Sequence, residues 1–279
     1  MPELPEVETV VRDLRPHLVG SRIASLRVSR HRLRQRWLPA WNQLLLGRQV
    51  KEIRRRGKWI CALLDDDRYL VFHLGMSGQL TIVARELPVQ KHTHVIFDLD
   101  DGVSQLRFRD IRRFGLVVVV EDQAALEALL DPGKLGPEPF DLKPAYWRRR
   151  LTATRRCLKA ALLDQRLVAG VGNIYADESL FEAGLPPTQR GSQTSADEAD
   201  RLRRSIVRVL NRAIARRGSS IQSYVGGEGL QGEYQNEFRA YGRTGEPCPR
   251  CDTPIERIRL AGRSTHFCPR CQKKAVRGR

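Results

Sequence analysis

The sequence lacks a long hydrophobic run. Its longest aliphatic stretch, Leu116 to Val120, has five residues, whereas a membrane-spanning helix needs about 18 or more. The opening segment MPELPEVETV is acidic and has neither the basic nor the apolar region of a secretory signal peptide. We therefore expect no membrane insertion and no secretion, and a cytoplasmic location.

Aromatic residues are also scarce, and acidic residues are outnumbered by basic ones. Aromatic residues make up 6% of the chain, which argues against an extended stacking platform for single-stranded nucleic acid. The 49 Lys and Arg outnumber the 32 Asp and Glu, which leaves a net charge of +17. Because this excess is spread along the chain, it favours nucleic acid over a membrane surface as the partner. A basic surface that serves solubility alone is the alternative.

Four of the six cysteines form two pairs near the C-terminus, Cys248 with Cys251 and Cys268 with Cys271. Two-residue gaps within the pairs, and sixteen residues between them, are typical of a tetrahedral zinc site with four thiolate ligands. Two disulfides would need an oxidising compartment, which nothing else in the sequence indicates. We expect one structural zinc ion, and we expect the isolated Cys61 to be inert.

Hydrophobic periodicity predicts an α+β fold. A helical spacing of apolar residues at the start predicts an N-terminal amphipathic helix: Val7, Val10, Val11, Leu14 and Leu18. From about Arg22 to Val120 the period becomes two, as in Val95, Phe97 and Leu99, which predicts an antiparallel β-sandwich.

Beyond the Pro- and Gly-bearing linker at 131–139, helical patterns dominate. Ser195 and Glu198 form a capping box before a long amphipathic helix. The arginines on its polar face are expected to be solvated without a specific contact: Arg201, Arg204, Arg208 and Arg212. The predicted domains are 1–133, 134–232 and 233–279.

The dipeptide Met1-Pro2 has chemical significance. Initiator methionine is commonly removed before a small residue, which would leave the secondary amine of Pro2 as the terminus. An α-amino group has a pKa of about 7.7–8.0, so it can act as a nucleophile that forms a Schiff base. Glu3 and Glu6 lie within one turn of this amine, where a carboxyl group can transfer a proton. Stabilisation of the helix dipole explains Glu6 equally well.

Five motifs, in order along essentially the whole chain, resemble those of formamidopyrimidine-DNA glycosylases, bacterial enzymes that remove oxidised purines. They are MPELPEVETV at 1–10, HLGMSGQL at 73–80, RRFG at 112–115, GVGNIYADESLFEAGL at 170–185 and the cysteine-containing segment at 248–272.

The resemblance implies a bifunctional DNA glycosylase and abasic-site lyase of base excision repair. Pro2 would attack C1′ of the damaged nucleoside, and Glu3 would be the proton donor. Lys58 would act in β-elimination, and Arg263, on the zinc hairpin, would bind phosphate and act in δ-elimination.

The resemblance also implies a helix-two-turns-helix motif in the helical domain and a set of DNA contacts. The DNA-binding residues would be His73, Met76, His92, Arg112, Phe114, Arg155, Lys159 and Asn173. Met76, Arg112 and Phe114 would fill the space left by an extrahelical base. The glycine-rich segment 218–232 is expected to read the damaged base, in a pocket formed by Glu6, Ser219, Ser220 and Ile221.

Two departures from the family pattern affect the expected contacts. Ile111 stands where the family commonly has proline before the RRFG motif, and Thr154 begins a segment where the family often has a basic cluster; Arg155 is our choice for that contact.

The expected function is excision of 8-oxoguanine and formamidopyrimidines from duplex DNA through a Pro2 Schiff base, followed by β,δ-elimination at the abasic site, by a monomer on the bacterial nucleoid. A sister glycosylase for oxidised pyrimidines and a non-catalytic zinc-ribbon DNA-binding protein are the alternatives.

Overall fold

The computed structural model describes residues 1–130, 133, 135–220 and 225–273. The chain forms two compact units. The first comprises Met1–Asp131 and Ile214–Gln235, and the second comprises Pro132–Ala213 and Asn236–Arg279. Each unit is a group of residues that contact one another and combines separate stretches of the chain. The three predicted domain ranges, 1–133, 134–232 and 233–279, therefore stay a prediction.

The first unit begins with helix α1 (Leu4–Leu18). Pro5 in its first turn suits the N-terminus of a helix, where the missing N–H has no partner to lose. The five apolar residues expected to form its inner face are all buried, with exposures of 2% or less. In the sequence-based prediction this helix was amphipathic, and the structure confirms it.

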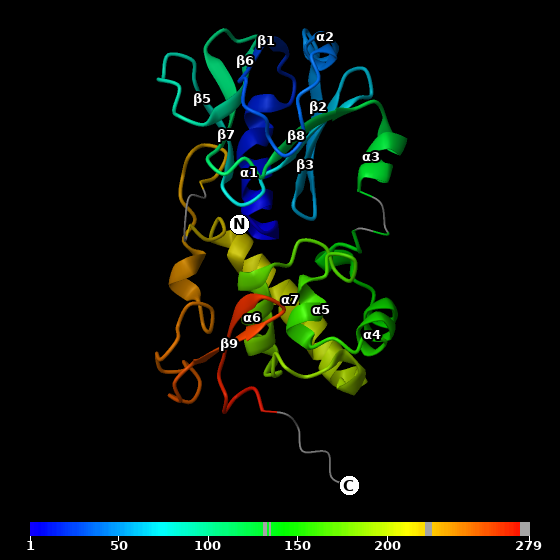
Figure 1. Ribbon diagram of the computed structural model, residues 1–279, viewed down its shortest axis with the longest axis vertical. Coiled ribbons are helices and arrows are strands. Elements are labelled where there is room, and N and C mark those ends of the chain that lie inside the picture. Colours follow the sequence, from blue (N-terminus) through cyan, green and yellow to red (C-terminus); the bar gives the residue numbers. More distant parts are fainter. Residues whose placement is uncertain (131–132, 134, 221–224, 274–279) are drawn as a thin grey trace. The chain divides into compact units, whose positions relative to one another are not determined.

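Two four-stranded antiparallel sheets follow α1 in the first unit, as the sequence predicts (Figure 1). One sheet has the order β1-β6-β7-β5 and the other β2-β3-β4-β8. The strands are β1 (Ile23–Val28), β2 (Val50–Arg56), β3 (Trp59–Leu64), β4 (Tyr69–His73), β5 (Gly78–Ala84), β6 (Thr93–Leu99), β7 (Ser104–Asp110) and β8 (Leu116–Val120). Short helices α2 (Ala40–Leu45) and α3 (Gln123–Leu129) follow β1 and β8.

Aromatic side chains join the two sheets face to face. Phe72 of β4 lies 6.2 Å from Phe97 of β6 and 6.3 Å from Phe108 of β7, measured between ring centroids. All three rings are buried, and burial of such rings is a large apolar contribution to stability. Helix α1 contacts strands of both sheets, β2 and β3 on one and β5 on the other.

The second unit is helical with one β-hairpin. Its helices are α4 (Pro144–Thr152), α5 (Leu158–Leu163), α6 (Asn173–Ala183) and α7 (Ala196–Ala215), whose last two residues belong to the first unit. Short 3₁₀ turns lie at η1 (Pro139–Asp141) and η2 (Gly191–Gln193), and η3 (Tyr234–Glu237) begins in the last residues of the first unit and ends in the second. The capping box of α7 is confirmed, because Ser195 N donates to Glu198 Oε2 and Glu198 N donates to Ser195 Oγ.

Strands β9 (Glu256–Leu260) and β10 (Arg263–Phe267) form an antiparallel hairpin, which lies in the sequence between the two cysteine pairs. Strand β10 contacts α6. No described helix is long and apolar enough to cross a membrane.

Candidate functional site

The start of α1 is buried by its own acidic residues and by the glycine-rich segment. Glu3 and Glu6 are 2% and 1% exposed. Glu6 Oε2 accepts a hydrogen bond from Glu3 N at 2.8 Å, which closes a capping box at the helix N-terminus. Glu6 Oε1 accepts another from Ser219 N at 2.8 Å. One carboxylate therefore holds both the chain terminus and the segment after α7.

Gly218 allows this close approach. Its φ is +73°, and a Cβ at this position would lie 2.7 Å from Glu6 Oε1. Any side chain would therefore be strained and would displace the carboxylate. Ser220 is held separately, since its N–H donates to Gln235 Oε1 and its Oγ accepts from Gly232 N. Ile221, expected in the same pocket, lies outside the described residues.

The terminal amine is surrounded by charge. Burial lowers the pKa of the Met1 amine below its ordinary value of 8.0, and Lys58 and Arg112 lower it further, while Glu3 and Glu6 oppose the shift. A lowered pKa increases the fraction of unprotonated amine at neutral pH, which is the nucleophilic form. The structure thus brings together a terminal amine, two buried carboxylates and Lys58.

Lys58 lies in the tight turn between β2 and β3 and is 7% exposed. Its charge also acts on His73, whose pKa falls to about 4, mainly through burial and then through Lys58 and Arg34. Because Gly75 N donates to His73 Nδ1 at 3.1 Å, the neutral ring carries its proton on Nε2. His73 is therefore a neutral hydrogen-bond donor at neutral pH.

Two loops of the first unit bring Met76, Arg112 and Phe114 together. A Cβ at Gly75 would lie 2.6 Å from the carbonyl carbon of Phe114, so the loops are in backbone contact. Phe114 is 48% exposed, and the Arg112 guanidinium lies 4.8 Å from its ring centroid. An exposed cation–π pair of this kind offers planar groups for stacking.

Asp110, which sequence reasoning did not assign a role, organises these loops. It is fully buried. Its carboxylate accepts hydrogen bonds from Ser77 Oγ, Arg112 N and Gly115 N. Its own N–H donates to the carbonyl oxygen of the exposed His92 at 2.9 Å. No local pattern signals this role, because the Ser77 and His92 partners come from distant parts of the chain.

In the second unit, Asn173 is the first residue of α6 and its Oδ1 is buried, with no partner among the described residues. Gly172 is the N-cap, so the positive end of the helix dipole lies beside Asn173. Arg155 is exposed. Lys159 is fully buried instead, and its Nζ lies 2.7 Å from Asp177 Oδ1 and 2.8 Å from Asn173 O. The Lys159 side chain therefore has no exposed surface for a direct contact with DNA, and that expected contact stays a prediction.

The four C-terminal cysteines converge on one point. Their Sγ atoms all lie within 4.8 Å of one another. Contacts of 3.3, 3.5 and 3.9 Å join Cys251 to Cys271, Cys251 to Cys268, and Cys248 to Cys271. A tetrahedron with Zn–S bonds of about 2.3 Å has edges of about 3.8 Å. The cluster fits one zinc ion with no coordination position left for water, which is a structural site.

Three carboxylates of α6 attach the zinc module, residues 239–273, to the helices. Asp177 Oδ2 accepts from His266 N at 2.9 Å and lies 3.1 Å from His266 Nδ1. Glu178 accepts three backbone hydrogen bonds, from Arg239, Ala240 and Tyr241. Strand β10, which begins with Arg263, is thereby held against the helix that begins with Asn173.

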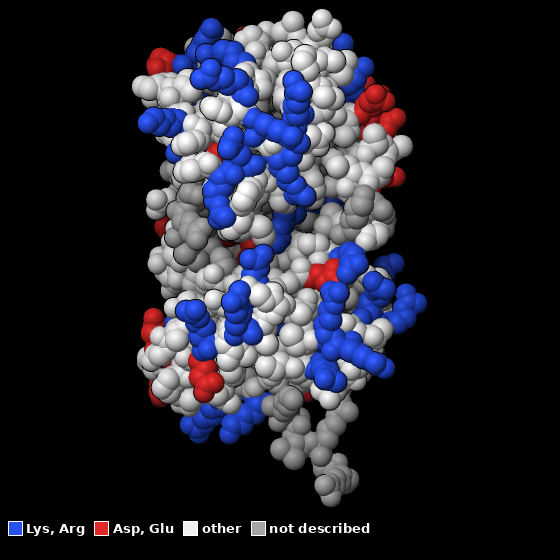
Figure 2. Space-filling view, viewed as in Figure 1, with Lys and Arg blue, Asp and Glu red and all other residues white. Residues whose placement is uncertain are grey.

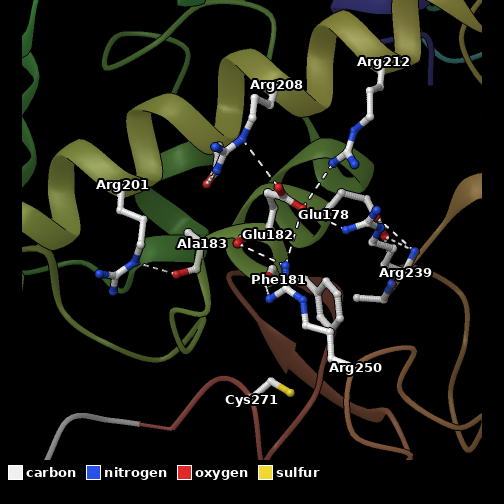
Figure 3. Close-up of polar contacts among 12 residues, drawn as sticks. Glu178, Phe181, Glu182, Ala183, Arg201, Arg208, Arg212, Arg239, Arg250 and Cys271 are labelled. Carbon is white, nitrogen blue, oxygen red and sulfur yellow. Dashed lines mark hydrogen bonds and ion pairs between the residues drawn. The ribbon is translucent and has the colours of Figure 1, made fainter.

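Glu182 is the third of these carboxylates and contacts four arginines (Figure 3). Arg208 and Arg212 come from α7, and Arg239 and Arg250 from the zinc module, with N···O distances of 3.1 to 3.5 Å. Burial opposes ionisation of Glu182, but Arg212, Arg239 and Arg208 together hold its pKa below the ordinary value.

The expectation that the α7 arginines make no specific contact is therefore wrong for three of them, since Arg201 Nε also donates to Ala183 O at 2.8 Å. The carboxylate that Arg208 and Arg212 contact comes from another helix, so the pattern of α7 alone did not reveal it.

Comparison with known proteins accounts for this set of features. Family models match the Formamidopyrimidine-DNA glycosylase N-terminal domain at residues 1–117, its H2TH domain at 135–225, and the zinc finger found in FPG and IleRS at 245–274. The chain is 43% identical to the formamidopyrimidine-DNA glycosylase of Desulforamulus reducens over 279 residues, covering 98% of this chain and 99% of that one.

Solved structures agree. A mutant of Lactococcus lactis FPG in complex with Fapy-dG containing DNA has a TM-score of 0.90 and 37% identity, covering 98% of this chain and 100% of that one. MutM in complex with carbocyclic 8-oxo-G containing DNA has a TM-score of 0.89 at 37% identity, with the same coverage. From the site geometry, the three family models and the full-length similarity, we conclude that this chain belongs to the formamidopyrimidine-DNA glycosylase family.

Proposed function

We propose that this protein excises oxidised purines, namely 8-oxoguanine and formamidopyrimidines, from duplex DNA and then cleaves the strand at the abasic site. The observation that carries the proposal is the terminal amine, which has a lowered pKa and lies near Glu3, Glu6 and Lys58. Met1 is 46% exposed and Pro2 is buried beneath it. Removal of Met1 would therefore transfer the amine to Pro2, inside this set of charges.

The proposed chemistry balances with these groups. The Pro2 nitrogen bonds to C1′ and passes its proton to Glu3, while the bond from C1′ to the base breaks and the base leaves with the electron pair and a proton donated by Glu3. Glu3 then donates a proton to the sugar ring oxygen as the C1′–O4′ bond opens, which leaves an iminium between Pro2 and C1′. Loss of a C2′ proton expels the 3′ phosphate, a second elimination expels the 5′ phosphate, and water releases Pro2.

The remaining residues are proposed to hold the duplex. Phosphates would be bound by Lys58, His73 and His92 of the first unit and by Arg155, Asn173 and Arg263 of the second. Lys159 would orient Asn173 through its bond to the Asn173 carbonyl. Met76, Arg112 and Phe114 would occupy the space of the extrahelical base. The base itself would lie against Glu6, Ser219, Ser220 and Ile221.

The net charge of +17 supports duplex DNA as the partner. Since that substrate is chromosomal, we place the protein on the bacterial nucleoid as a monomer.

The experiment is product analysis on a panel of duplexes, each with one defined lesion. We expect release of 8-oxoguanine and formamidopyrimidines and a strand break with phosphate at both ends. Preferential release of oxidised pyrimidines would favour the sister activity. Binding without release of any base would favour a non-catalytic zinc-ribbon protein.

A further inference from the structure

A concave basic site lies in the second unit, between the end of α4 and the turn that joins α5 to α6. It has a volume of about 490 Å³, and its lining includes Arg150, Thr154, Arg156, Asp164 and Arg166. We call these residues the α4–α5 pocket. Lys and Arg gather over α4 and α5 on the face drawn in Figure 2. None of these five residues belongs to the DNA contacts expected from the family motifs.

Asp164 fixes two of the three arginines. Arg166 binds it through Nε and Nη2, both at 2.9 Å, and Arg156 binds it through Nη1 at 3.0 Å. The hydrogen bond from Arg166 is the largest cause that lowers the pKa of Asp164. The carboxylate is therefore ionised at neutral pH, and the guanidinium groups are held in place before any ligand arrives.

The pocket still carries excess positive charge. Three guanidinium groups against one carboxylate leave +2 among these residues. The side chains of Arg156 and Arg166 are 56% and 53% exposed. A guanidinium has five N–H donors, and Asp164 uses only part of this capacity. Arg150 is exposed and has no carboxylate partner within the described part of the chain. Such a site suits phosphate groups, which arginine binds in a bidentate manner.

The turn beyond the pocket leads directly to Asn173. Gln165 braces this turn, since its Nε2 donates to Val171 O at 2.7 Å and its Oε1 accepts from Gly170 N at 2.9 Å. The pocket and the N-terminus of α6 therefore lie at the two ends of one braced segment. A volume of about 490 Å³ exceeds what one phosphate needs, so the site suits a continuing backbone better than a single ion.

We propose that the α4–α5 pocket binds backbone phosphates of duplex DNA beyond those contacted next to the lesion, and so lengthens the stretch of DNA that the protein holds. This inference rests on the proposed function, because it takes the same duplex as its ligand.

Arg150→Ala is the decisive variant, because it breaks no ion pair among the residues that the structure describes. Arg148→Ala is its matched control. Arg148 lies on the same helix and pairs with Asp200, so its removal changes the net charge equally outside the pocket. Binding is measured by fluorescence anisotropy on duplexes with a non-cleavable abasic analogue, lengthened stepwise on each side. Melting temperature and zinc content are measured for each variant.

On the longest duplex we expect Arg150→Ala to bind about 3- to 10-fold more weakly than wild type and to lower the salt slope by about 0.9, as for one lost phosphate contact. On the shortest duplex it should bind like wild type, and Arg148→Ala should show the smaller effect throughout. Arg150→Lys should recover part of the affinity. Equal effects of Arg148→Ala and Arg150→Ala, or an Arg150→Ala effect independent of duplex length, would overturn the inference.

A small phosphate compound free in solution is the alternative ligand for the α4–α5 pocket, because it offers the same phosphate groups as DNA. Inorganic pyrophosphate titrated calorimetrically into DNA-free protein tests it, and we expect no saturable binding that Arg150→Ala removes. Such binding without a duplex-length effect would reassign the pocket to a free ligand. If wild type bound no duplex at all, the proposed function itself would fail. If wild type bound and cleaved normally while Arg150→Ala matched its control, only this inference would fail.

Discussion

Glu3 and Glu6 share the first turn of α1, but their hydrogen bonds differ. Glu6 uses its two oxygens on Glu3 N and Ser219 N, so its role is to hold the backbone. Glu3 adjoins Pro2 and lies near the terminal amine. Both carboxylates take part in the capping box, so we propose proton transfer for Glu3 because it adjoins Pro2, and positioning for Glu6 because it also binds Ser219 N.

We therefore expect Glu3→Gln to lose most base excision, because an amide cannot donate the proton, while cleavage at a preformed abasic site falls less. Glu8→Gln is the control, since Glu8 lies on the same helix and pairs with Arg12 and Arg55. Release of free base and strand cleavage are assayed separately. Equal loss of both steps in Glu3→Gln would show that Glu3 is not specifically the acid of base release.

His73 should make stability depend on pH. Its pKa is about 4 in the folded protein, against an ordinary value of 6.5. The unfolded chain therefore binds more protons than the folded chain between these pH values. The free energy of unfolding is accordingly highest above pH 6.5 and decreases as pH falls towards 4. The slope is at most about 1.4 kcal/mol per pH unit.

Urea unfolding across this range should show a smaller loss of stability for His73→Gln than for wild type. His17→Gln, which changes an exposed histidine paired with Glu228, should behave like wild type. Superimposable curves for wild type and His73→Gln would contradict the assigned burial.

At the scale of elements, α6 joins the parts of the second unit that we propose to bind DNA. Its first residue is Asn173, and Asp177, one turn later, contacts both Lys159 of α5 and His266 of β10. The side chains of Lys159 and Asp177 have no exposed surface. Removal of one member of a buried ion pair leaves an uncompensated charge, which costs about 3–5 kcal/mol.

Asp177→Asn should therefore destabilise the second unit by about that amount, and adding Lys159→Met should restore part of the loss. Thermal unfolding of the two single variants and the double variant gives the coupling energy. Additive losses would mean that the pair is not coupled. If DNA binding by the double variant depended less steeply on salt concentration than binding by wild type, Lys159 would contact DNA directly.

The role of the zinc ion and the role of Arg263 can be tested with separate variants. Cys268→Ser should release the metal and abolish DNA binding while leaving the β-sandwich folded, because the metal orders the hairpin. Arg263→Ala should keep the metal, weaken binding to every duplex and lower the salt slope by about one. Metal content and binding are measured together. Normal binding by metal-free protein would exclude the hairpin from the site, and loss on one sequence alone would mean that Arg263 reads bases.

Local patterns predicted the elements whose stabilising contacts are close in sequence. The apolar face of α1, the capping box at Ser195 and the paired cysteines are of this kind. The buried carboxylates were not predicted. Asp177 bonds to His266, 89 residues away, and Asp13 bonds to Arg217 and Gly227, 204 and 214 residues away. A lone acidic residue on a helix gives no signal of such a partner.

At the scale of the whole molecule, the charge of +17 and the family's motifs give a consistent account. Each unit supplies basic groups: Lys58 and Arg112 in the first, and the α4–α5 pocket and Arg263 in the second. We propose that Pro2, Glu3 and Lys58 of the first unit carry base excision and β-elimination, whereas Arg263, expected to act in δ-elimination, belongs to the second unit. The account therefore rests on the identity of one nucleophile.

Borohydride trapping tests that identity most directly. The protein is incubated with a duplex that carries an abasic site, reduced with borohydride, digested, and mapped by mass spectrometry. We predict a mature chain that begins at Pro2 and a covalent adduct on the Pro2 nitrogen. An adduct mapped to Lys58 or another internal lysine, or a trapped chain that still carries Met1, would contradict the account.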